Sequence, residues 1–132
     1  MKNIYIIITI MALCSFGCNH KTKDNNMVGH LKIIKGNHDF GLVKKESILR
    51  GYFILQNTSD ITLYYKKIYS DCDCTKIINP KDSLVSGQID TLNFSIDTKG
   101  MIQGQIIENS VRVIANAKPE MSKLFVKFKI EE

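Results

Sequence analysis

Hydrophobic and polar residues alternate with a period of two through most of the chain after residue 30. The clearest example is the segment 91–97, where Leu92, Phe94 and Ile96 alternate with polar side chains. The segment 123–130 has the same pattern, with large apolar residues at the even positions and lysine at most odd positions. Such alternation is typical of strands with one buried face, whereas an amphipathic helix requires a period near 3.6. The pattern therefore predicts an all-β chain.

Turn residues divide this region into about seven short strands. Asn, Asp, Ser and Gly gather at 36–37, 57–60 and 97–100, where they favour turns. Strands at a spacing of about 8–12 residues are typical of a β-sandwich, and a small barrel is the alternative. The inward phase slips by one residue between Tyr65 and Ile68, and this slip predicts a β-bulge.

The first 17 residues differ from the rest and predict a secretory signal peptide. Lys2 precedes an almost unbroken apolar run, 4–13, which is shorter than the ~20 residues of a bilayer span. The segment 15–18 (Ser-Phe-Gly-Cys) resembles the lipobox of bacterial lipoproteins, so Cys18 is the predicted lipidation site. Phe16 departs from this pattern, because a small residue is usual there. An uncut anchor helix and ordinary cleavage that leaves a plain thiol are the alternatives.

The segment 18–29 is interpreted as the lipidated cysteine and a flexible tether, because 19–26 contains only polar residues. The β-sandwich then spans 30–132. We therefore expect a protein secreted across the inner membrane and held as a membrane-anchored lipoprotein. The absence of an acidic cluster directly after Cys18 favours a periplasm-facing location.

Length and charge narrow the possible functions. The chain has 132 residues, enough for one domain, and a formal net charge of +5 spread over interleaved lysines and acids. An excess spread in this way is typical of a solvated surface. No basic run with interleaved aromatic residues is present, so we expect no nucleic-acid partner.

Cys72 and Cys74 form the candidate redox or metal pair of the mature domain. An oxidising envelope permits a disulfide between them. Cysteines at i and i+2 of an extended strand lie near the upper limit of disulfide Cα separation, so the bond would be strained and easily reduced unless the backbone bends. Two thiolates could instead bind Cu(I) or zinc, with Asp71 or Asp73 nearby. In the third interpretation both cysteines are small packing residues.

The other residues do not complete a metal or catalytic site. A zinc site generally needs four ligands, and His20, His30 and His38 all lie toward the N-terminus. We expect no cofactor and identify no metal site. Asp71 and Asp73 are interpreted as solvated charges rather than as an acid–base pair. No Ser-His-Asp arrangement or phosphate-binding loop is present, so we expect no enzymatic activity and no catalytic residue.

An ordered series of short motifs resembles a known family. The series comprises Asp39-Phe40-Gly41, Phe53-x-Leu55-x-Asn57, Leu63, Ile68, Cys72-Asp73-Cys74-Thr75, Asp97-Thr98-Lys99-Gly100, Gly104 and Val111-x-Val113 before Asn116. Over residues 38–130 this series resembles the domain of unknown function 1573 family, which is common among Bacteroidetes lipoproteins. The resemblance implies an immunoglobulin-like fold and a location in the cell envelope. It implies no reaction, because the family has none assigned.

Two positions depart from the family pattern. Asp73 stands where the family usually has glycine, which makes the turn more acidic and less suited to a positive φ. Ser86-Gly87 stands where a Pro-Gly pair often precedes the next strand.

The first functional hypothesis is a lipid-anchored envelope β-sandwich that acts as a non-enzymatic binding or structural module. Its expected partners are the membrane, through the N-terminal lipid, and another envelope protein or surface ligand. Sandwiches bind through end loops or by adding a strand to an exposed sheet edge. We expect such edges at 31–35 or 124–130.

The alternative is a thiol-redox or metal-handling protein that uses the Cys72/Cys74 pair. This function requires an accessible thiol with a depressed pKa. Lysines at 66, 67 and 76 would favour the thiolate, whereas the two adjacent aspartates oppose it. We therefore predict unremarkable thiol reactivity.

Overall fold

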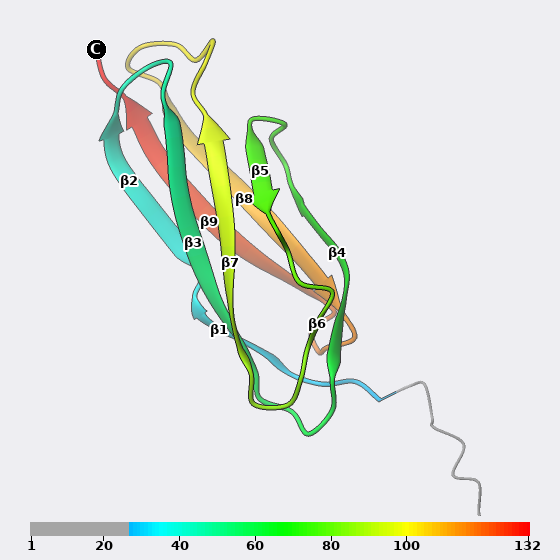
Figure 1. Ribbon diagram of the computed structural model, residues 1–132. Helices are drawn as coiled ribbons and strands as arrows, with labels where there is room; N and C mark the ends of the chain where they lie inside the picture. The colour runs from blue at the N-terminus through cyan, green and yellow to red at the C-terminus, as the bar shows by residue number, and fades with distance from the viewer. Residues whose placement is uncertain (1–26) are drawn as a thin grey trace, which may run out of the picture.

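The computed structural model describes residues 27–132, which form nine strands in two packed sheets (Figure 1). Sheet 1 has the order β1 (Leu31–Lys35), β3 (Ile48–Asn57), β7 (Ile89–Asp97) and β5 (Thr75–Ile78). Sheet 2 has the order β2 (Asn37–Val43), β9 (Met121–Ile130), β8 (Ile106–Ala115), β4 (Leu63–Ser70) and β6 (Ser83–Leu84). The predicted all-β sandwich is confirmed. No helix able to cross a membrane occurs between residues 27 and 132.

The strand count exceeds the expected seven for two local reasons. The chain changes sheets at Gly36, so the first expected strand is followed at once by β2, which pairs in parallel with β9. The other addition, β6, has only two residues, Ser83 and Leu84, which is too short to show alternation. The predicted bulge in β4 is confirmed, because its register with β8 shifts between Tyr65 and Lys67.

The core contains the inward positions that the alternation predicts. Phe53 and Phe94 are fully buried and stack with ring centroids 4.7 Å apart. Phe40 enters from β2, and its ring meets that of Phe94 edge-on at 6.1 Å. Gly51 lies beneath these two rings, where a Cβ atom would be 2.5 Å from the Phe94 ring. The aromatic packing thus explains why glycine occupies an inward position of β3.

The expected edge at 124–130 is wrong. β9 lies between β2 and β8, and both of its sides are hydrogen-bonded. Its regular alternation reflects one buried and one exposed face, which a central antiparallel strand can also have. The other expected edge, Leu31–Lys35, is an edge strand of sheet 1.

Buried polar residues fasten the loops at both ends of the sandwich. Asn57 at the end of β3 donates from Nδ2 to the carbonyl oxygens of Ile61 at 2.7 Å and Leu84 at 2.8 Å. At the other end, Thr98 is fully buried, and its hydroxyl accepts the Ser47 N–H at 2.8 Å. Buried polar groups need such partners, so these two residues fix loop conformations rather than bind ligands.

A charged residue is also buried between the sheets. Asp90 occupies an inward position of β7, and its carboxylate lies 3.1 Å from Lys81 Nζ and 3.3 Å from the Tyr65 hydroxyl. Burial, together with the Asp90 charge, raises the pKa of Tyr65, which therefore remains a neutral hydrogen-bond donor. The carboxylate is thus paired within the fold and is not free for chemistry.

The N-terminal segment and the cysteine pair lie at opposite ends of the domain. Leu31 of β1 pairs with Asn57, the last residue of β3. The Cys74 carbonyl accepts the Asp97 N–H at 3.0 Å, and Asp97 pairs with Ile48, the first residue of β3. The ten residues of β3 separate the two points by about 30 Å.

Candidate functional site

The cysteine pair lies in the turn where the chain crosses from one sheet to the other. β4 belongs to sheet 2 and ends at Ser70, whereas β5 belongs to sheet 1 and begins at Thr75. We call residues 71–74, which connect these strands, the corner. The corner therefore joins the two layers at the end of the sandwich that is distant from the N-terminal segment.

Cys72 and Cys74 form a disulfide. Their Cα atoms are 5.2 Å apart, within the usual range and closer than the about 6.7 Å of an extended i, i+2 pair. The Thr75 N–H donates to the Cys72 carbonyl at 3.1 Å, so the backbone makes the bend that the disulfide interpretation requires. Asp73 does not have a positive φ, and the turn therefore forms without the glycine usual in the family.

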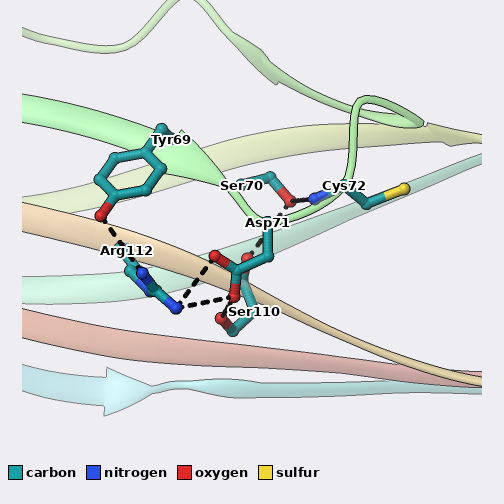
Figure 2. A network of polar contacts seen from close by, with 6 residues as sticks. All are labelled: Tyr69, Ser70, Asp71, Cys72, Ser110 and Arg112. Carbon is teal, nitrogen blue, oxygen red and sulfur yellow. Dashed lines mark hydrogen bonds and ion pairs between the residues drawn. The ribbon is translucent and has the colours of Figure 1, made fainter.

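A polar network holds the corner against β8 (Figure 2). The guanidinium of Arg112 binds the Asp71 carboxylate, with Nη2 3.1 Å from Oδ1 and 3.2 Å from Oδ2. Its Nη1 donates to the Tyr69 hydroxyl at 3.4 Å. The Ser110 hydroxyl also binds Asp71, while the Ser70 hydroxyl bridges the Ser110 carbonyl and the Cys72 N–H. The hydrogen bond to Tyr69, followed by the Asp71 charge, raises the pKa of Arg112.

Arg112 is the residue of this network that sequence reasoning missed. The sequence suggested lysines as the cations nearest the cysteines, but Lys66 pairs with Glu120 at 2.6 Å. Lys67 lies over the Tyr69 ring, 4.7 Å from its centroid. Arg112 is 38 residues from Cys74 in the sequence, and only the pairing of Tyr69 with Arg112 across β4 and β8 brings it to the corner. Local sequence contains no signal of that pairing.

The sulfur atoms of the disulfide accept contacts from nearby N–H groups. The Asn109 amide donates to Cys74 Sγ at 3.5 Å, and the Cys74 N–H points to Cys72 Sγ at 3.2 Å. Within residues 27–132, no group of three His, Cys, Asp or Glu side chains is placed to hold a metal ion. His30 binds Thr58, and His38 packs against Phe40, both far in sequence from the corner. Cys18 and His20 lie outside the described residues.

A groove lies on the outer face of sheet 2, next to the polar network. Its volume is about 330 Å³, and its lining residues are Asn37, His38, Asp39, Glu108, Phe125, Val126 and Lys127. Phe125, one of these lining residues, is 52% exposed. Phe125 pairs across the strands with Ser110, whose hydroxyl binds Asp71. One serine therefore lies between a groove residue and the corner.

Solved structures show what this fold is similar to. A protein of unknown function from Porphyromonas gingivalis W83 matches with a TM-score of 0.67 and 13% identity, over 84% of this chain and 51% of that one. The seventh PapD-like (ASH) domain of human CEP192 matches with a TM-score of 0.63 and 10% identity, over 80% and 88%. The secreted serine protease VesC from Vibrio cholerae matches with a TM-score of 0.58 and 13% identity, over 76% and 23%. These likenesses establish an immunoglobulin-like, PapD-like fold.

The chain spans about half the length of the Porphyromonas gingivalis protein it matches. No curated protein matches the sequence. The family model described as "Protein of unknown function (DUF1573)" matches residues 31–130, which is nearly the whole described domain. The motif series that resembled this family is thus confirmed as family membership: the chain belongs to the DUF1573 family.

Proposed function

We propose that this protein is a lipid-anchored envelope module that binds another envelope protein and catalyses no reaction. The observation that carries this proposal is the Phe125 groove on the outer face of sheet 2. Exposed aromatic residues beside arginine are typical of interface anchors, because they combine large apolar area with directed hydrogen bonds. Phe125, Tyr69 and Arg112 supply these groups on adjacent strands.

The groove has the chemistry of a recognition surface. Glu108 is held by Lys127 at 3.1 Å along one side, and Asn37 lies beside Phe125 on the other. A partner side chain placed over the Phe125 ring would meet charged and amide groups at its rim. Such an apolar centre with a polar rim is the usual arrangement of a protein interface. The lipid on Cys18, predicted from the sequence, would keep the domain close to the membrane and to other envelope proteins.

Site-specific photocrosslinking tests this proposal. A photoreactive phenylalanine analogue is placed at Phe125, and as a control at Ile102, which lies in a loop of the same domain and is more exposed (70% against 52%). We expect one discrete adduct from position 125 in intact cells, and its loss when Arg112→Ala is added. Identical adducts from both positions, or none from position 125, would contradict a binding role for the groove.

The disulfide favours thiol exchange as a second candidate function. Both sulfur-bearing residues are half-buried rather than enclosed in the core, so a small thiol can approach them. In an exchange reaction, a thiolate of a model dithiol attacks one sulfur of the Cys72–Cys74 disulfide, and the dithiol ends as a disulfide while the two cysteines are reduced. Rapid reduction of the folded natural protein by the dithiol would support this candidate, and a disulfide that reacts only after denaturation would exclude it.

A further inference from the structure

The outer face of sheet 1 carries cations that have no acidic partner among residues 27–132. Because the odd positions of β3 point into the core, Arg50 points outward, in one row with Ser95 and Lys76. Lys32 and Lys35 lie beside outward positions of β3 in the same sheet. The ion pairs found between residues 27 and 132 include none of these four cations.

Acidic residues are nearly missing from this face. Among the outward positions of the four strands of sheet 1, Asp97 alone is acidic. On sheet 2, by contrast, Arg112, Lys127 and Lys129 are paired with Asp71, Glu108 and Glu132. The net positive charge of the domain is therefore available to a partner mainly at sheet 1.

Apolar side chains lie between the cations. Tyr52 is 42% exposed, Ile34 47% and Ile89 53%, and Lys35 Nζ is 3.8 Å from the centroid of the Tyr52 ring. Their neighbours on β7 are the uncharged residues Thr91, Asn93 and Ser95. Lysine and arginine stems extend along apolar surface with their charges at its border, and tyrosine favours the boundary between lipid and water. The face thus combines the groups that suit a bilayer surface.

The N-terminal segment bridges Ala117 of the β8–β9 connection at Gly29 and then enters sheet 1 as β1. β1 is the edge strand of sheet 1, and the preceding Met27 and Val28 are exposed and apolar. If Cys18 is lipidated, which rests on the proposed function, residues 19–30 reach at most about 40 Å. Such a short connection raises the effective concentration of the bilayer above that of any untethered acidic protein.

We propose that the outer face of sheet 1 lies against an anionic phospholipid bilayer. Lys32, Lys35, Arg50 and Lys76 bind the headgroup phosphates, while Tyr52 and its apolar neighbours enter the interfacial region. The outer face of sheet 2, with its Phe125 groove, then points away from the membrane toward a partner. The same tethered domain therefore uses its two faces for two different surfaces.

Vesicle binding by charge-reversed variants tests whether the cations of sheet 1 bind the headgroup phosphates. The protein with Cys18→Ser is mixed with phosphatidylglycerol vesicles, so that binding does not depend on a lipid anchor. We expect Arg50→Glu/Lys76→Glu to weaken binding at least tenfold, at about fivefold per cation. The control Lys67→Glu/Lys123→Glu makes the same change of net charge on sheet 2 and should weaken binding less than about threefold. Equal losses, or no binding to these vesicles, would overturn the proposal.

Tryptophan reporters test the orientation. The natural chain has no tryptophan, so Tyr52→Trp and Phe125→Trp each introduce a single probe on one face. On phosphatidylglycerol vesicles we expect a blue-shifted emission from position 52 and an unchanged emission from position 125. A shift at position 125 alone would assign the membrane to sheet 2, and no shift at either would leave an acidic protein as the partner of sheet 1. Circular dichroism of each variant verifies folding.

The lipid anchor is tested separately by the intact mass of the protein from membranes. An unmodified Cys18 would contradict the proposed anchoring, yet the vesicle experiments, made without a lipid on that residue, would still decide the role of sheet 1. The two failures are therefore distinguishable.

Discussion

The two outer faces of the sandwich share one core but manage charge differently. Sheet 2 neutralises most of its strand cations internally, as in the pair between Arg112 and Asp71 at 3.1 Å, and leaves Lys67 and Lys123 without an ion pair among residues 27–132. Sheet 1 pairs none of its strand cations with an acidic residue of that range, and Arg50 lies beside the uncharged Ser95. An internally paired face is suited to shape-specific recognition, whereas an unpaired face is suited to a diffuse anionic surface. Under our proposal, this difference gives the domain a membrane side and a partner side.

The exposed apolar residues of the two faces are also arranged differently. Sheet 2 has a defined groove around Phe125, fastened to the disulfide corner through Ser110. The exposed apolar residues of sheet 1, such as Tyr52 and Ile89, are spread between polar neighbours. A bilayer can bind apolar residues that are spread out in this way. A protein partner generally binds through a few anchor residues that are clustered at one place. Four predictions, made with five variants, would break or sharpen this comparison.

The largest effect is expected in the core that both faces share. Phe94→Ala should lower the free energy of unfolding by about 3–5 kcal/mol, because a fully buried ring stacked on Phe53 leaves a cavity. Chemical denaturation measures this loss, and vesicle binding and crosslinking should then decline together. A variant that retained one face while losing the other would show that the two sheets are not one cooperative unit.

Removing the disulfide should have an intermediate effect confined to the corner. Because Cys72 and Cys74 close a loop of only three residues, Cys72→Ser/Cys74→Ser should cost about 1.5 kcal/mol of stability. Loosening of Asp71 should reduce crosslinking at the groove and leave vesicle affinity unchanged. Denaturant midpoints and the two binding assays check these outcomes, and a loss of vesicle affinity would contradict the expectation that the disulfide acts on the groove and not on sheet 1.

Two arginines offer a matched comparison of smaller size. Arg112→Ala removes a guanidinium that binds Asp71 and Tyr69, so we expect the melting temperature to fall by a few degrees. Arg50→Ala removes a charge without an acidic partner, so its melting temperature should remain close to that of the natural protein. Thermal unfolding in low salt measures both. A larger decrease for Arg50→Ala would mean that sheet 1 also pairs its charges internally.

The smallest expected effect is on the pH dependence of stability, and it comes from His38. Burial, followed by the charge of Lys35, lowers the pKa of His38 below its ordinary value of 6.5. The unfolded chain then binds a proton near pH 6.5 that the folded protein does not yet bind. Stability should therefore be constant above this pH and fall as the pH decreases from 6.5 to the lowered pKa. His38→Gln should remove that part of the slope in denaturation curves, and an unchanged slope would exclude His38 as its source.

Sequence alone predicted the fold because alternation is a local property. The inward residues Leu92, Phe94 and Ile96 and the bulge after Tyr65 are all where the pattern placed them. The family motifs proved to be largely structural, as Asn57 and Thr98 show by fastening loops at opposite ends.

The site was less accessible to sequence reasoning, because it depends on which strands become neighbours. The groove combines Asn37, Glu108 and Phe125 from three strands, and the parallel pairing of β2 with β9 gives no local signal. Alternation also could not distinguish an edge strand from a central one, which is why the edge predicted at 124–130 was wrong. The cysteine pair itself was identified from sequence, but its contact with Asn109 was not.

Lysine footprinting of the lipidated protein on phosphatidylglycerol vesicles tests the central claim most directly. A water-soluble amine-acylating reagent and mass spectrometry would compare Lys32 and Lys76 on sheet 1 with Lys123 on sheet 2, in one sample. We predict that vesicles protect Lys32 and Lys76 severalfold and leave Lys123 as reactive as in solution. Protection of Lys123, with Lys32 and Lys76 still reactive, would contradict the assignment of the two faces.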